Sequence, residues 1–193
     1  MEYQIALNMG DYMTDDEFFR FCQMNDNLSF ERNANGQIII MPPTTSKTGI
    51  ANLKIGSAVF FWNENTDFGL AFDSSTGFKL PNGATRSPDV AWIRKDRWQQ
   101  LTPEQQESFA PICPDFVVEI RSKSDDLKTL QDKMEEYKAN GCQLGWLIDL
   151  KNQEVYVYRN DQAVEKVENF EQKLSGENVL QGFSFDLKKL STL

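Results

Sequence analysis

Two acids and a lysine stand where separate elements of the chain could bring them together. Asp89 precedes an apolar run at 90–93, Glu119 lies in a second apolar run, and Lys133 lies in the amphipathic segment that follows. Carboxylate oxygens are the ligands that hard divalent cations prefer. A cation held by them polarises a phosphate and acidifies water, while a lysine can orient or deprotonate that water or neutralise developing charge. These residue types suit metal-dependent hydrolysis of a phosphodiester.

Each of the three residues also has an ordinary structural explanation. An aspartate after proline at the start of a strand, such as Asp89, is often a turn residue. Glu119 can form an ion pair with a neighbour such as Arg121, and Lys133 can be solvated at the flank of a helix. From residue types alone, the catalytic and the structural explanations both stay open.

Other kinds of catalytic centre are excluded by composition. The chain has no histidine, which removes Ser/His/Asp and Cys/His triads, histidine general bases and the usual histidine-containing zinc sites. Its three cysteines, Cys22, Cys113 and Cys142, include no CxxC pair, as expected of free thiols in a reducing compartment. Any catalysis must use carboxylates, Lys, Tyr, Ser or Cys together with a metal.

Size and charge limit the class of protein. The 193 residues fit a single domain over 1–193, and 40% hydrophobic with 25% charged residues is typical of soluble globular proteins. The first ten residues lack the features of a signal peptide, and no stretch approaches the roughly 20 apolar residues that span a membrane. We therefore expect a cytoplasmic protein without membrane contact. The net charge of -9 disfavours a broad basic surface for nucleic acid but permits a local positive groove.

The hydrophobic pattern predicts an α/β architecture. A capping box at Thr14 and Glu17 opens one helix, a second begins near Ser46 with its aromatic end in the core, and a third carries Lys133. Strands are expected at 28–32, 37–41, 69–72, 77–80, 88–93, 115–121, 144–150 and 154–159, followed by a C-terminal β-meander. The turn at 33–36 should close an N-terminal β-hairpin, and 94–114 should be a surface excursion. The strand–helix–strand order over 115–150 predicts a parallel pair inside a mixed central sheet.

Several sequence runs together carry a resemblance to a known family. They are FERNANGQIIIMPPTTS at 30–46, SPDVAWIRKDR at 87–97, PDFVVEIRSKSD at 114–125, the helix with Lys133 and Tyr137, and GWLIDLKNQEVYVYR at 145–159. In order and spacing these runs resemble the Uma2 family over about residues 11–160. Members of that family are regarded as endonucleases of the PD-(D/E)xK superfamily. The resemblance implies a restriction-endonuclease-like fold, with a mixed central sheet flanked by helices.

The same resemblance implies roles for particular residues. The metal-binding acids fall on Asp89 and Glu119, the catalytic lysine falls on Lys133, and a glutamate of the N-terminal hairpin falls on Glu31. Arg121 stands where the superfamily usually has its lysine, and it could bind phosphate but is a poor proton acceptor because its pKa is above 12. The implied cofactor is Mg²⁺ or Mn²⁺.

The chain departs from the family pattern at two places. Many members have a histidine after the hairpin where this chain has Lys47 or Thr48, and the common Ser-Pro-Ser reads Ser122-Lys123-Ser124. Both changes leave the two acids and the lysine intact.

These observations lead to an expected function and to two alternatives. We expect a metal-dependent DNA endonuclease that works as a homodimer, because cutting both strands takes two sites. The acidic charge keeps open a catalytically silent interaction domain of the same fold. Hydrolysis of RNA or of a small phosphodiester is a third hypothesis that the sequence does not separate from the first.

Overall fold

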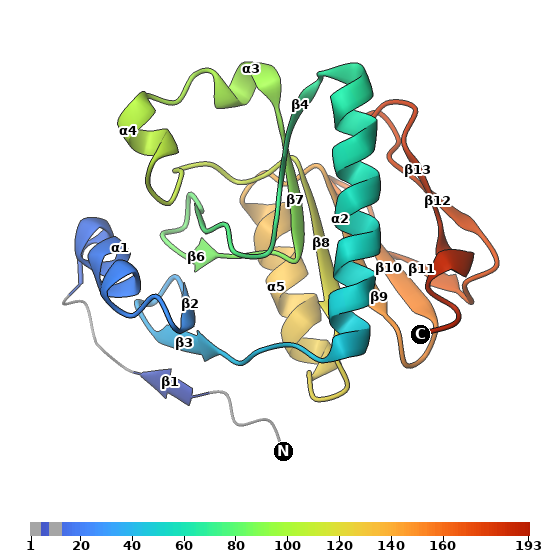
Figure 1. Ribbon diagram of the computed structural model, residues 1–193, viewed down its shortest axis with the longest axis horizontal. Helices are drawn as coiled ribbons and strands as arrows, with labels where there is room; N and C mark the ends of the chain where they lie inside the picture. Colours follow the sequence, from blue (N-terminus) through green and yellow to red (C-terminus); the bar gives the residue numbers. More distant parts are fainter. Residues whose placement is uncertain (1–4, 8–12) are drawn as a thin grey trace.

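The computed structural model describes residues 5–7 and 13–193, which form sheets of six, five and two strands with two long helices (Figure 1). The architecture is the predicted α/β type, with a mixed central sheet flanked by helices and strands toward both ends of the chain. Most of the first ten residues, on which the targeting prediction rests, lie outside this description. In the part of the chain that is described, no helix is both long enough and apolar enough to cross a membrane.

The central sheet has the strand order β11-β10-β9-β8-β7-β4. Its strands are β4 (Gly69–Phe72), β7 (Val90–Arg94), β8 (Phe116–Arg121), β9 (Leu144–Asp149), β10 (Glu154–Arg159) and β11 (Glu165–Glu168). The pair β8–β9 is parallel and is joined by helix α5 (Leu127–Ala139), whereas the other pairs are antiparallel. The predicted strand–helix–strand unit is therefore confirmed.

Two helices cover opposite faces of this sheet. Phe116, Val118 and Ile120 of β8 pack in one cluster with the inner side of α2 (Ser46–Thr66). Val117 of β8 packs in another cluster with Met134 of α5. Alternation along β8 therefore turns Glu119 toward the α5 side of the sheet, where Lys133 lies.

A smaller sheet holds the N-terminal hairpin against this assembly. Its order is β1-β3-β2-β6-β5, with β1 (Ile5–Leu7), β2 (Ser29–Arg32), β3 (Ile38–Met41), β5 (Phe78–Lys79) and β6 (Thr85–Arg86), and helix α1 (Asp15–Met24) packs on it. The predicted hairpin turn is confirmed, with Gly36 at φ 83. Strand β2 also pairs with β6 through Arg32 and Thr85, which brings the run leading to Asp89 beside Glu31.

Three segment predictions need correction. The excursion after β7 contains the short helices α3 (Lys95–Trp98) and α4 (Pro103–Gln106), but its last part is buried because Ala110 and Ile112 pack on Phe78 and Ile93. The aromatic end of α2 is only partly core, since Phe60 and Phe61 point to solvent. The predicted C-terminal β-meander is formed by β9, β10 and β11, but it does not continue into the last two strands. β11 extends the central sheet, whereas β12 (Lys173–Ser175) and β13 (Ser184–Asp186) pair separately and pack over the α2 side.

Gly69 in β4 packs so closely against its neighbours that they leave no room for a side chain. A Cβ at Gly69 would collide with the carbonyl oxygen of Ile93 and come within 2.5 Å of the Trp92 ring, whereas a Cβ at Gly56 in α2 would meet Val90 Cγ2 at an ordinary 3.6 Å. We expect Gly69→Ala to lower the free energy of unfolding by about 2–3 kcal/mol, because backbone cannot move aside cheaply. The matched Gly56→Ala should raise it by about 0.5–1 kcal/mol through helix propensity. Urea denaturation measures both, and equal effects of the two changes would contradict this packing.

Candidate active site

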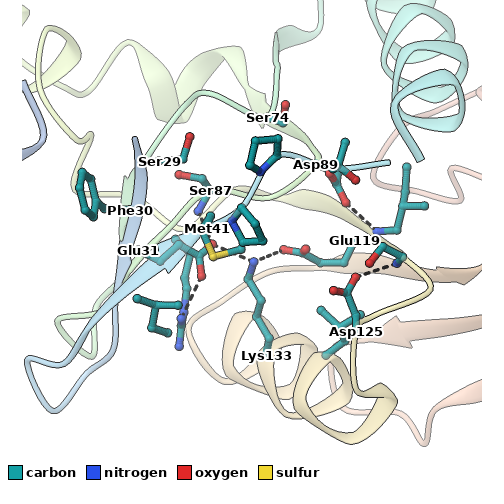
Figure 2. Close-up of a pocket in the computed structure, with 18 of the residues that line it drawn as sticks. Ser29, Phe30, Glu31, Met41, Ser74, Ser87, Asp89, Glu119, Asp125 and Lys133 are labelled. Carbon is teal, nitrogen blue, oxygen red and sulfur yellow. Dashed lines mark hydrogen bonds and ion pairs between the residues drawn. The ribbon is translucent and has the colours of Figure 1, made fainter. Parts of the chain in front are cut away.

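A pocket of about 850 Å³ opens between the N-terminal sheet and the central sheet (Figure 2). Glu31, Asp89, Glu119 and Lys133 all line it, although they come from four different segments of the chain. Glu31 lies in β2, Asp89 directly before β7, Glu119 in β8 and Lys133 in α5. The structure thus brings together four of the five residues that the sequence nominated.

Lys133 joins the two sheets through its ammonium group. Its Nζ lies 2.8 Å from Glu31 Oε1 and 2.8 Å from Glu119 Oε1, and the side chain is only 10% exposed. Burial by itself lowers the pKa of Lys133, but the charges of Glu119 and Glu31 outweigh it and raise the pKa above its ordinary value. Lys133 is therefore a positive charge fixed between two carboxylates.

The two carboxylates that hold Lys133 differ in their surroundings. Burial raises the pKa of Glu119 to about 7, with Asp89 and Glu31 adding to the shift and Lys133 opposing it. Glu31 is also buried, but the charges of Lys133 and Arg86 keep its pKa below the ordinary value. Arg86 Nη1 lies 3.1 Å from Glu31 Oε2, and the Ser87 backbone N–H donates to Oε1 at 2.9 Å. Glu31 is a satisfied anion, whereas Glu119 sits where negative charge is costly.

Asp89 is oriented by two hydrogen bonds. The side-chain amide of Asn52 in α2 donates to Oδ1 at 2.9 Å, and the backbone N–H of Ile120 donates to Oδ2 at 2.7 Å. Val90 is the antiparallel partner of Val118. Extending this register by one residue pair places Asp89 opposite Glu119, so their Cβ atoms should lie about 5 Å apart. Burial raises the pKa of Asp89, with the two hydrogen bonds and Lys133 opposing the shift.

Asp89 and Glu119 have the donor chemistry for a hard divalent cation. Tyr137 Oη donates to Glu119 Oε1 at 3.1 Å, so this contact and that of Lys133 fall on one oxygen, and no described residue donates a hydrogen bond to Oε2. Across residues 5–7 and 13–193, no three acidic, cysteine or histidine side chains converge so as to hold a metal ion by themselves. Two carboxylates with water or substrate oxygens completing the shell is an arrangement common for Mg²⁺.

Arg121 does not join the other four residues. Its Nη1 lies 2.7 Å from Asp149 Oδ2, and its Nε donates to the carbonyl of Asp125 at 3.0 Å. The parallel register explains this contact, because Arg121 is the Cα partner of Asp149 at the ends of β8 and β9. The guanidinium is therefore occupied at the strand ends and does not line the pocket.

Sequence reasoning missed two side chains that orient the site. Asn52 holds Asp89, and Arg86 bridges Glu31 to Glu136, with Nε 2.6 Å from Glu136 Oε2. A signal for Asn52 existed, because Thr48 and Asn52 are polar residues four apart on the inward side of a largely apolar helix. Arg86 had no comparable signal beyond its closeness to Asp89 in the chain.

Comparison with known proteins supports this assignment of the fold. A family model described as "Uma2: Putative restriction endonuclease" matches residues 15–188. A solved structure from Anabaena variabilis, described as "a putative nuclease belonging to DUF820", superposes with a TM-score of 0.77 over 93% of this chain and 98% of that chain. The two sequences are 22% identical, so this likeness shows a shared fold. No curated protein matches the chain.

The raised pKa of Glu119 makes stability fall with pH when divalent ions are removed. Between its ordinary pKa of 4.5 and its folded pKa of about 7, the native protein binds more protons at Glu119 than the unfolded chain does. The free energy of unfolding should therefore fall by on the order of 2 kcal/mol as pH rises through this window. Urea denaturation with a chelator measures the slope, and Glu119→Gln should flatten it. A native slope equal to that of the Gln variant would contradict the assignment. Glu31 affects stability only at lower pH. Because its folded pKa is below 4.5, its contribution to the free energy of unfolding is lost as pH falls and the carboxylate is protonated.

Proposed function

The chain belongs to the Uma2 family, and from this membership we propose that it is a DNA endonuclease whose divalent cation, Mg²⁺ or Mn²⁺, is held by Asp89 and Glu119. The family description supports the coarser statement that the protein is a nuclease, a hydrolase acting on nucleic acid. The finer proposal rests on one observation, which is that Asp89, Glu119 and Lys133 line a single open pocket. The fold does not require these charged groups at this place, because apolar side chains could have filled the space between the two sheets.

Asp89 and Glu119 would hold the cation. When bound, it supplies positive charge beside the scissile phosphate and acidifies a water molecule. Asn52 and the Ile120 N–H leave Asp89 little rotational freedom, and Tyr137 and Lys133 hold Glu119 by Oε1. The two acids are therefore oriented before any ligand arrives, which lowers the cost of assembling the site.

Lys133 would act on the substrate through its charge and its N–H groups. Two of its donors point at Glu31 and Glu119, both at 2.8 Å, and an ammonium has three. The remaining N–H can donate to a phosphate oxygen or orient water in the pocket. Glu31, with Arg86 and the Ser87 N–H behind it, is a positioning residue that fixes Lys133 from the N-terminal sheet.

Arg121 receives a structural role in this proposal. Its pairing with buried Asp149 joins the ends of β8 and β9, and the strand that carries Glu119 ends at this residue. Phosphate binding through Nε or Nη1 of Arg121 would break these contacts and leave the buried Asp149 without its charged partner.

Double-strand cleavage would take two copies of the chain, so we propose a homodimer acting on DNA. The competing hypothesis of a catalytically silent interaction domain differs in one measurable respect. A silent domain should show no stoichiometric Mn²⁺ binding that depends on Asp89 and Glu119, and calorimetric titration of the native chain separates the two. Competition between DNA, RNA and small phosphodiesters distinguishes the possible substrates.

Removal of the charged groups should lower cleavage strongly in variants that are still folded. We expect Asp89→Asn, Glu119→Gln and Lys133→Met each to lower metal-dependent cleavage of plasmid DNA by at least about 100-fold, because each removes a group that acts on the phosphate or the cation. Asp96→Asn is the matched control, since Asp96 is an exposed carboxylate paired with Arg94 away from the pocket. Circular dichroism checks folding. Unchanged cleavage in all three variants would refute the site.

Loss of the amide that orients Asp89 should weaken metal binding. We expect Asn52→Ala to raise the dissociation constant for Mn²⁺ by about 10-fold, as for other groups that orient a metal ligand. Asn65→Ala is the control, because Asn65 lies on the same helix and its side chain donates to the Phe61 carbonyl of that helix. Titration calorimetry measures both, and equal affinities would show that Asn52 does not orient the ligand.

A further inference from the structure

Arg86 is a second basic residue in the wall of the pocket. Among residues 5–7 and 13–193, the basic side chains that line the pocket are those of Lys133 and Arg86. Arg86 ends strand β6, and its side chain is only 10% exposed. A charged group held at this depth beside a phosphate-cleaving site can do more than pair with its neighbours in the chain.

The guanidinium of Arg86 uses only part of its hydrogen-bonding capacity within the chain. Its Nη1 donates to Glu31 Oε2 at 3.1 Å, and its Nε donates to Glu136 Oε2 at 2.6 Å. A guanidinium has five N–H groups, and no described residue accepts a hydrogen bond from Nη2. In the described chain the fully buried side-chain polar atom without a partner is Trp146 Nε1, so Arg86 Nη2 is not enclosed by protein. Because Arg86 lines the pocket, Nη2 can donate to a molecule that enters it.

A comparison with Arg32 shows what an arginine with a structural role looks like in this fold. Arg32 is also buried, but its Nη1 donates to the Met13 carbonyl and its Nη2 to the Asp15 carboxylate. Arg32 does not line the pocket. Both ends of its guanidinium are thus used within the chain, whereas one end of the Arg86 guanidinium is not.

We propose that Arg86 binds the phosphodiester that is cleaved, with Nη2 donating to a non-bridging oxygen of the phosphate. The planar guanidinium suits phosphate because it combines a permanent charge with N–H groups in a fixed geometry. This inference rests on the proposed nuclease function and adds to it a residue that contacts the substrate. Arg86 keeps all its protons in this role and acts only by charge and hydrogen bonding.

The position of Arg86 places it across the pocket from the acids that would hold the cation. Glu31 binds Lys133 through Oε1 and Arg86 through Oε2. Figure 2 shows Glu31 and Asp89 on opposite sides of the Lys133 ammonium. The negative charge of a phosphate is spread over its non-bridging oxygens. One oxygen can therefore face the side of Asp89 and another the side of Arg86, with Lys133 between them.

Negative charge dominates the rest of the lining. Besides Glu31, Asp89 and Glu119, five acids line the pocket, which are Asp26, Asp125, Asp126, Asp132 and Glu136. Such a surface repels a phosphate that approaches it. A bound phosphodiester therefore needs direct contacts with positive groups, and in the described lining Lys133 and Arg86 are the side chains that can make them.

Binding of an oligonucleotide should depend on Arg86. The test uses the Glu119→Gln chain, in which little cleavage is expected and in which the charges of Lys133 and Glu31 balance each other. In this chain we expect Arg86→Gln to raise the Kd for a fluorescein-labelled DNA oligonucleotide by about 10-fold, because one charge-assisted hydrogen bond is lost. The slope of log Kd against log salt concentration should become shallower by about one, since one phosphate contact disappears. Fluorescence anisotropy with Mn²⁺ present measures both quantities.

Arg94→Gln in the same Glu119→Gln chain is the matched control. Arg94 pairs with Asp96 away from the pocket, so this substitution changes the net charge equally and should leave both the Kd and the salt slope unchanged. Arg86→Lys retains the positive charge and should keep the salt slope. Circular dichroism establishes that each variant is folded.

A second measurement distinguishes contact with the substrate from an indirect effect on the acids. In the chain with Glu119 intact, we expect Arg86→Lys to lower kcat/KM for DNA cleavage by about 10-fold, because an ammonium lacks the planar fork of the guanidinium. The affinity for Mn²⁺ in calorimetric titration should not change. A parallel loss of Mn²⁺ affinity would overturn the inference, since Arg86 would then act through Glu31 and Lys133. This variant also decides the question if Arg86→Gln does not fold.

Failure of this inference differs from failure of the proposed function. If the native chain cleaves DNA and Arg86→Gln binds the oligonucleotide as tightly and with the same salt slope as Arg94→Gln, the inference is wrong and the nuclease function stands. If the native chain neither binds nor cleaves nucleic acid with Mn²⁺ present, the proposed function is wrong, and the inference that rests on it is overturned as well.

Discussion

The ammonium of Lys133, placed between Glu31 and Glu119, is the interaction on which the pocket depends. It is the point at which the N-terminal sheet, the central sheet and α5 meet, and each partner comes from a different element. Charges in such a place are stable only together, because removal of one leaves another buried without compensation, at a cost of about 3–5 kcal/mol. The relative positions of the two sheets and the charge of the site are thus set by the same contact.

Surrounding groups make this concentration of charge tolerable. Arg86 and the Ser87 N–H complete the hydrogen bonds of Glu31, and Tyr137 donates to Glu119. The three carboxylates are not compensated equally. Nearby positive charges and N–H donors stabilise the negative charge of Glu31, whereas burial keeps the negative charge of Glu119 and Asp89 unfavourable. A cation at the two latter carboxylates would relieve that cost. The carboxylates for which charge is most costly are therefore the ones best suited to hold a cation.

Features that depend on neighbouring residues in the sequence could be predicted, whereas features that depend on contacts between distant segments could not. Periodicity and turn chemistry were sufficient for β8, α5 and β9, because their pattern is local. Family-like motifs singled out Asp89, Glu119 and Lys133, which line one pocket in the structure. Contacts that depend on tertiary packing could not be predicted from the sequence. The pairing of Arg121 with Asp149 depends on the register of two strands, and the bridge from Arg86 to Glu136 depends on how β6 meets α5. Exposure of Phe61 was also missed, because an apolar residue in a helix gives no sign of which side lacks a cover.

The N-terminal hairpin has a further consequence for the order in which the chain acquires its structure. Glu31 precedes Lys133 by 102 residues, about half of the 193-residue chain, so on a ribosome it is made long before Lys133 exists. Until then Glu31 can pair with Arg86 and with the Ser87 N–H, but it lacks its charged partner on α5, so the hairpin cannot complete its contact with the central sheet. Closure of the long loop between them is slow compared with local pairing. Docking of the hairpin should consequently be a late event during synthesis, and a chain interrupted before α5 should hold its N-terminal sheet away from the rest.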